Sequence, residues 1–126
     1  WPVEEGVVIQ NFGTQIHPVV RTTKIKSNGI TIATTQTADA RAIFKGIVMT
    51  VLSYKGSNPT VLVQHGNYIT AYTNLESVYV KRGQSLSPKE KIGKVFTNPN
   101  TGKTELKFSI FQSSTPLNPK GWIYRL

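Results

Sequence analysis

Side chains able to bind a metal or transfer protons are scarce in this sequence. The chain has two histidines, six acidic residues and no cysteine, which excludes disulfides and thiolate metal sites. His17 precedes Pro18 in a predicted turn, and His65 ends a predicted strand before Gly66. Neither histidine is spaced with the other, or with Glu105, as metal ligands usually are. The sequence also has no Gly-rich phosphate loop leading from a strand into a helix.

Polar side chains that could form a binding surface lie on two predicted strands. Side chains alternate between the faces of a strand. In the segment 104–111 this predicts a core face made of Leu106, Phe108 and Ile110, and an opposite face made of Glu105, Lys107 and Ser109. In the segment 68–74 it separates Ile69 and Ala71 from Tyr68, Thr70, Tyr72 and Asn74. If the two polar faces meet, they form a polar groove on a floor of strands.

The elements that would hold these side chains are predicted to be β-strands. Thr, Val, Ile and Tyr are frequent, Gly and Pro recur throughout, and no stretch carries a helical stripe. The predicted strands are Gly6–Phe12, Gly29–Thr34, Ala40–Lys45, Gly46–Tyr54, Thr60–His65, Tyr68–Asn74, Ser77–Val80, Lys91–Thr97 and Thr104–Phe111. Short turns between them predict an all-β fold, with antiparallel sheets forming a sandwich or open barrel. The segment from Val78 to Gly93 predicts a β-hammerhead-like step, with its glycines at positive φ.

Length and charge restrict the classes of protein. A chain of 126 residues predicts one domain, residues 1–126. No run approaches the ~20 apolar residues of a membrane span. The formal net charge of +9 favours anionic surroundings, such as a cell envelope or nucleic acid. Because the Lys and Arg residues are scattered, we do not expect a nucleic-acid-binding patch.

The ordered motifs resemble one family. The chain is similar to the LytM/lysostaphin-type zinc peptidases over nearly its whole length. The resemblance lies in Trp1-Pro2-Val3, Phe12-Gly13, Asn28-Gly29-Ile30-Thr31-Ile32, Gly46-Ile47-Val48, His65-Gly66-Asn67-Tyr68, Tyr72-Thr73-Asn74-Leu75, Ile92-Gly93, Thr104–Ile110 and Leu117-Asn118-Pro119. It implies a LytM-like (duplicated hybrid motif) fold.

The resemblance also implies where a zinc site would lie. Active members carry His-x-Gly-x-Asp on an early strand, and Ser27 and Thr31 occupy those two ligand positions here. The histidine of the central hairpin corresponds to Asn74, and the final His-x-His pair to Glu105 and Lys107. Neutral hydroxyls are poor zinc ligands, and a protonated lysine has no lone pair. We therefore expect no metal, no cofactor and no peptidase activity, because nothing would activate a water.

A fold kept without its ligands implies a binding function. Degenerate domains of this family occur in EnvC- and NlpD-type murein hydrolase activators, and this chain resembles the EnvC type. That resemblance implies a non-catalytic module that activates a peptidoglycan amidase. We expect the partner to bind a groove lined by Ser27, Asn28, Thr31, Tyr72, Asn74, Glu105 and Lys107. The resemblance further implies export to the periplasm or cell envelope of a Gram-negative bacterium, with an export signal and coiled coil upstream.

Three alternatives stay open. The domain could bind peptidoglycan directly, using its positive charge and Tyr68 or Tyr72, or it could retain some zinc peptidase activity through unusual ligands. The simplest alternative is a solvated strand face on which Glu105 and Lys107 pair with each other.

Overall fold

The architecture is a sandwich of antiparallel strands, seen in a computed structural model. The structure describes residues 1–10, 13–16, 24–27, 29–53, 56–112 and 115–119, and for 13–16, 24–27 and 115 only the backbone path is described. Its strands are β1 (Val7–Gln10), β2 (Gly13–Ile16), β3 (Lys24–Ser27), β4 (Ile30–Thr34), β5 (Asp39–Arg41), β6 (Gly46–Leu52), β7 (Thr60–His65), β8 (Tyr68–Thr73), β9 (Leu75–Val78), β10 (Ser85–Leu86), β11 (Lys91–Val95), β12 (Thr104–Gln112) and β13 (Thr115–Leu117). The described part of the chain contains no α-helix and so no helix able to cross a membrane.

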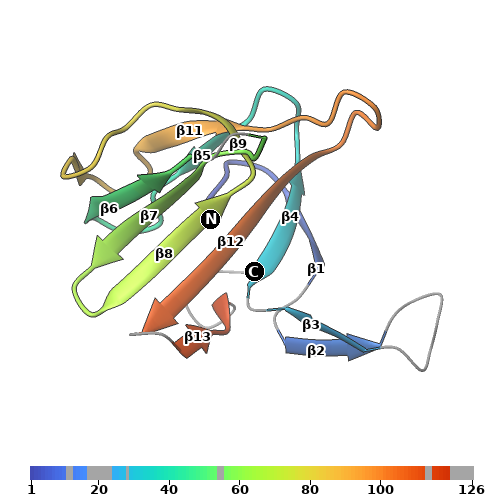
Figure 1. The fold of residues 1–126 in the computed structure, drawn as a ribbon, viewed down its shortest axis with the longest axis horizontal. Coiled ribbons are helices and arrows are strands. Elements are labelled where there is room, and N and C mark those ends of the chain that lie inside the picture. The colour runs from blue at the N-terminus through green and yellow to red at the C-terminus, as the bar shows by residue number, and fades with distance from the viewer. Residues whose placement is uncertain (11–12, 17–23, 28, 54–55, 113–114, 120–126) are drawn as a thin grey trace.

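One large sheet forms the main layer. Its strands follow the order β1-β4-β12-β8-β7-β6-β10, and β13 pairs with the end of β12. A second sheet, β5-β11-β9, lies across one end of the first, and the β2–β3 hairpin projects beyond β1 (Figure 1). This confirms the predicted all-β class and the antiparallel sandwich.

The core lies between the large sheet and the three-stranded sheet. Alternation on β12 buries Leu106, Phe108 and Ile110, as the sequence predicts, and β7 buries Val61 and Val63 by the same period. The second sheet contributes aliphatic groups only, namely Ala40, Leu75, Ile92 and Val95. The predicted strands therefore supply most of this core.

The step between β9 and β11 differs from the prediction at one glycine. Gly83 has the expected positive φ of 86° and makes a tight turn. Gly93 instead lies within β11 and is buried. A Cβ there would collide with the Ser77 carbonyl oxygen, so glycine is required because the neighbouring backbone is close.

Candidate functional site

The predicted polar face centres on Thr31 and Lys107. In the β4–β12 pair Thr31 lies opposite Lys107, and in the β12–β8 pair Lys107 lies opposite Thr73. Side chains directly opposite each other in an antiparallel pair point to the same face, with Cβ atoms about 5 Å apart. The same cross-strand row continues to Gln10 on β1 and Thr60 on β7. The sheet thus brings together two of the residues chosen from the sequence.

Burial within this row is uneven. Thr31 is 7% exposed, whereas Lys107 is exposed. Glu105 is half-buried and lies on the same face of β12, opposite Ala33. The ion pairs among the described residues are Lys91–Asp39 and Lys94–Glu76, so Glu105 and Lys107 do not pair with each other. The structure thus lacks the expected pairing of these two charges, whereas a solvated strand face stays an open alternative.

Asn74 joins this site through its side chain. It follows β8 with a φ of 75°, a left-handed conformation that Asn adopts more readily than most residues. Its Nδ2 donates to the Glu105 carbonyl oxygen at 2.7 Å, and its Oδ1 accepts a hydrogen bond from Asn58 at 2.7 Å. These bonds fix Asn74 beside Glu105. The two residues line a hollow of about 240 Å³ together with Phe96, Asn98, Thr101 and Lys103.

Tyr72 corrects the sequence prediction. It lies opposite Phe108 on the core face of the large sheet, with ring centroids 5.2 Å apart, and is 0% exposed. Thr70 is buried on the same face. The faces of β8 are therefore the reverse of those expected, because two polar residues that can hydrogen-bond internally were assigned to solvent. Tyr72 does not line the groove.

Two candidate residues cannot be placed in the site. Asn28 lies outside the described residues, and for Ser27, at the end of β3, only the backbone is described. Ser27 pairs with Gly13 in the β2–β3 hairpin. Their place in the groove stays a prediction.

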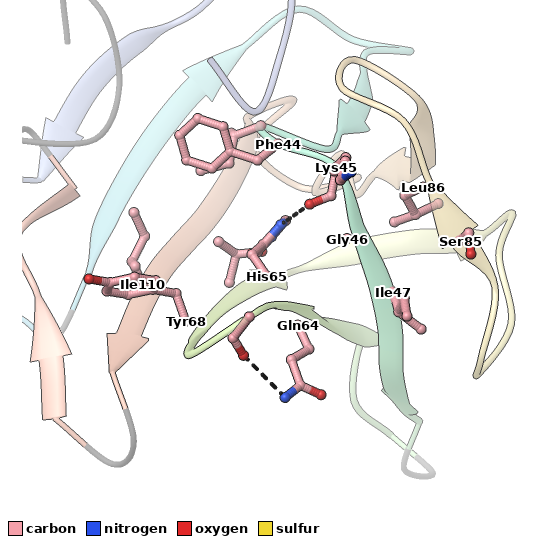
Figure 2. A pocket seen from close by; sticks show the side chains of 13 residues that line it. Phe44, Lys45, Gly46, Ile47, Gln64, His65, Tyr68, Ser85, Leu86 and Ile110 are labelled. Carbon is pink, nitrogen blue, oxygen red and sulfur yellow. Dashed lines mark hydrogen bonds between the residues drawn. The ribbon is translucent and has the colours of Figure 1, made fainter.

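A second hollow, which sequence reasoning missed, opens where β6 begins and β7 turns into β8. Its volume is about 670 Å³, and apolar side chains dominate its lining (Figure 2). His65 Nδ1 lies 2.8 Å from the Lys45 carbonyl oxygen, and Nε2 lies 2.9 Å from Thr70 Oγ1. Since a carbonyl only accepts, Nδ1 carries the proton and Nε2 accepts from Thr70. His65 is thus held by structural hydrogen bonds.

Phe44 is the residue that could have indicated this hollow, but it falls within the strand predicted over Ala40–Lys45. The strand β5 ends at Arg41, so Phe44 belongs to a loop and is 42% exposed. Its ring meets that of His65 edge-on, at a centroid distance of 6.1 Å. An apolar residue in the bend just before β6, next to Lys45, is the feature that could have indicated this site.

Comparison with known proteins identifies the fold family. A family model described as Peptidase family M23 matches residues 25–119. The chain belongs to peptidase family M23. Among solved structures, the M23 domain superposes on Helicobacter pylori Csd3 with a TM-score of 0.80 and 22% identity, covering 99% of this chain and 34% of that one. It superposes on a zinc-containing peptidase from Vibrio cholerae with a TM-score of 0.78 and 23% identity, covering 94% and 37%.

Further similar proteins include a component of a protein complex and two relatives found by sequence. A structure of the SpoIIIAH–SpoIIQ complex contains a similar chain, with a TM-score of 0.78, 22% identity and 98% coverage of both chains. By sequence, the M23 domain is 27% identical to an uncharacterized Haemophilus influenzae protein over 94% of this chain. It is 31% identical to the Vibrio cholerae peptidoglycan DD-endopeptidase ShyA over 58% of this chain. It spans 28% and 17% of the lengths of these two relatives.

The residues at the implied zinc site of this M23 domain do not fit the metal. The exposed ammonium of Lys107 lies beside Thr31, and of these two side chains only the Thr31 hydroxyl has a lone pair to offer. Of the five ligand and base positions, Glu105 alone has a zinc-binding side chain. Within the described residues, no three His, Cys, Asp or Glu side chains gather closely enough to hold a metal ion.

Proposed function

We propose that this M23 domain is a non-catalytic cell-wall module that activates a peptidoglycan amidase by binding it through the polar face around Lys107. The observation that carries the proposal is the pairing of Thr31 with Lys107 across β4 and β12. A hydroxyl and an ammonium stand where family resemblance places two zinc ligands. The ammonium repels a cation and attracts a carboxylate, which favours binding over metal-assisted hydrolysis.

The charges of this face support a protein partner. Glu105 and Lys107 lie two residues apart on β12 without an ion pair between them. A partner surface with an acidic and a basic side chain at matching spacing would pair with both and gain specificity. The solved SpoIIIAH–SpoIIQ complex includes a chain of similar fold within a protein complex. The EnvC-like motifs Asn28-Gly29-Ile30 and Tyr72-Thr73-Asn74-Leu75 point to an amidase.

The compartment follows from the proposed partner. An amidase that cuts peptidoglycan works outside the cytoplasmic membrane, so the protein is proposed to be exported to the periplasm of a Gram-negative bacterium. The absence of cysteine from the sequence is compatible with this placement.

The test combines co-purification with an activity assay. The domain is mixed with each exported amidase of the source organism, and release of labelled fragments from sacculi is measured with and without it. We expect activation of one amidase, and Lys107→Glu should weaken that binding at least tenfold, because it reverses the central charge of the face.

A matched variant controls for the change in net charge. Lys81 is exposed in the loop after β9 and has no ion pair among the described residues. Lys81→Glu alters the net charge equally and should leave amidase binding unchanged. Equal binding by the wild type and Lys107→Glu, with both folded, would reject the polar face as the binding surface. An unchanged turnover for every amidase would reject the function.

Direct binding to peptidoglycan is the second candidate, favoured by the net charge of +9. Its proposed aromatic platform is weakened, because Tyr72 is buried in the core and Tyr68 lines the separate hollow near His65. Pull-down on purified sacculi without amidase separates the two functions. Residual peptidase activity is tested by zinc analysis and a zymogram.

A further inference from the structure

The hollow near His65 has the layered composition of a docking pocket. Its deepest residues, Thr70, Leu86 and Ile110, are each no more than 3% exposed. Ile43, His65 and Tyr68 are half-buried and form its walls. Figure 2 shows the His65 ring directed at the Lys45 carbonyl, with the Phe44 ring beside it. Because both ring nitrogens are hydrogen-bonded, this wall keeps its shape before any ligand arrives.

Apolar surface continues from the interior of this pocket onto the outside of the protein. Phe44 is 42% exposed and Ile47 is 52% exposed, and both line its mouth. Large apolar side chains that gather around an apolar pocket mark interaction sites more often than scattered ones do. A small ligand enclosed in the pocket would leave the outer parts of both side chains in water. An occupant that extends past the mouth would cover them.

The charge of the lining restricts the occupant further. Among the described residues no carboxylate lines the pocket, whereas the exposed residue Lys45 lies at its mouth. Lys45 takes part in neither ion pair of the described residues. Gln64 and Ser85 add an amide and a hydroxyl to the same rim. An apolar centre with a polar rim is the usual anatomy of a protein interface.

We propose that this pocket receives a bulky apolar side chain, flanked by Asp or Glu, from an extended peptide segment of a partner protein. The side chain fills the space above Leu86 and Ile110, and the carboxylate pairs with Lys45. The peptide chain then covers Phe44 and Ile47. The interior residues Thr70 and Ile110 lie on the face of the large sheet opposite Lys107, so the interior of the pocket is separate from the polar face of the proposed amidase contact. Ile47 lies on the Lys107 face, but on β6, three strands away from β12.

The experiment uses short peptides rather than an unknown partner. The ¹⁵N-labelled domain is titrated with acetyl-Glu-Trp-Glu-amide, acetyl-Glu-Ala-Glu-amide and acetyl-Lys-Trp-Lys-amide, and amide chemical shifts are followed by NMR. We expect saturable shifts at residues 43–47, 64–68 and 85–86 with the first peptide. Replacing Trp by Ala or Glu by Lys in the peptide should weaken binding about fivefold or more, which is the usual effect of removing one important interface side chain.

The chain supplies matched variants. Ile47→Ala and Phe44→Ala should each weaken the Glu-Trp-Glu peptide at least about fivefold. Ile9 on β1 is 53% exposed, nearly the same as Ile47, and does not line the pocket. Ile9→Ala should therefore bind like the wild type. Equal affinity for all three peptides, shifts centred elsewhere, or unchanged binding by Ile47→Ala would each overturn the proposal.

Two further measurements distinguish a peptide from a small amphiphile as the ligand, and this pocket from the proposed amidase-binding face. Titration with dodecanoate tests a small amphiphile in place of a peptide, and tight dodecanoate binding without peptide binding would also overturn the proposal. Lys107→Glu should bind the Glu-Trp-Glu peptide normally. Because no amidase is present, failure here leaves the amidase proposal intact, and failure of the amidase assay leaves this result intact.

Discussion

At the level of single residues, the proposed function depends mainly on the pair formed by Thr31 and Lys107. Their positions follow from resemblance, but their contact follows only from the register of β4 and β12. A shift of one residue in that register would place Lys107 opposite a side chain of the other face. The observed register therefore shows that two positions matched to zinc ligands by resemblance are neighbours in the sheet.

Zinc binding is predicted to be lost in the wild type and recoverable by substitution. Purified domain should contain well below one zinc per chain by atomic emission spectrometry. The triple variant Ser27→His, Thr31→Asp and Lys107→His restores three ligands of the types that zinc prefers, so its zinc content should rise toward one per chain.

The control for metal recovery is Thr31→Ala with Lys107→Ala, which removes the ammonium without adding ligands and should stay free of zinc. Tightly bound stoichiometric zinc in the wild type would contradict the non-catalytic assignment.

Tyr72 predicts a dependence of stability on alkaline pH. Burial raises the pKa of Tyr72 to about 12, and hydrogen bonds with Thr70 and the Ile43 N–H partly oppose this rise. An unfolded tyrosine has a pKa of about 10. The stabilising contribution is therefore complete below pH 10 and is lost as the pH rises toward 12, by about 1.4 kcal/mol per pH unit.

The comparison with Tyr72→Phe isolates this effect. The variant should lose about 1–3 kcal/mol at neutral pH, because the Ile43 N–H loses its acceptor. The difference between wild type and variant in urea unfolding should then shrink above pH 10. A difference that stays constant to pH 12 would show that Tyr72 does not titrate as its burial requires.

At the scale of elements, the sequence predicts strands well where side chains alternate and poorly where strands are short or polar. The nine predicted strands each overlap an observed strand, because branched apolar residues recur with a period of two. The short strands β2, β3, β10 and β13 were missed. The segment from Ser85 to Leu86 forms a strand only because β6 offers a partner, and no local pattern encodes that.

The face of β8 was misread for a similar reason. Thr70 and Tyr72 are polar enough to suggest solvent, and only tertiary contacts with His65, Ile43 and Phe108 satisfy them in the core. The sequence did not predict the hollow at Phe44, because segments distant in the sequence form its lining. Local patterns give strands and alternation, whereas pockets depend on how the strands are placed.

Gly29 is predicted to be essential for the approach of β4 to β12. An added Cβ would run into the Phe108 carbonyl oxygen and the Ser109 hydroxyl. Gly29→Ala should therefore lower the free energy of unfolding by about 1–3 kcal/mol, measured by urea denaturation. Gly83→Asn is the contrasting variant, since Gly83 has open space around it and a positive φ that Asn tolerates. Equal stability of the two variants would exclude the close approach at Gly29.

At the scale of the whole molecule, net charge and the polar face should act differently. The charge of +9 is spread along the chain, so any binding to anionic sacculi should fall steeply as salt rises from 50 to 500 mM. Lys107→Glu and Lys81→Glu should weaken it equally, as measured by sedimentation with sacculi. A selective loss with Lys107→Glu would instead make this face a glycan-binding site.

The position of β12 has a consequence for the cost of recognition. This strand is hydrogen-bonded to β4 on one side and β8 on the other, and its core-facing side chains are buried. Glu105 and Lys107 therefore project from a backbone that opens only when much of the sheet unravels. A partner would need to immobilise little more than the ends of these side chains. Little of the binding free energy would therefore be lost to ordering the backbone.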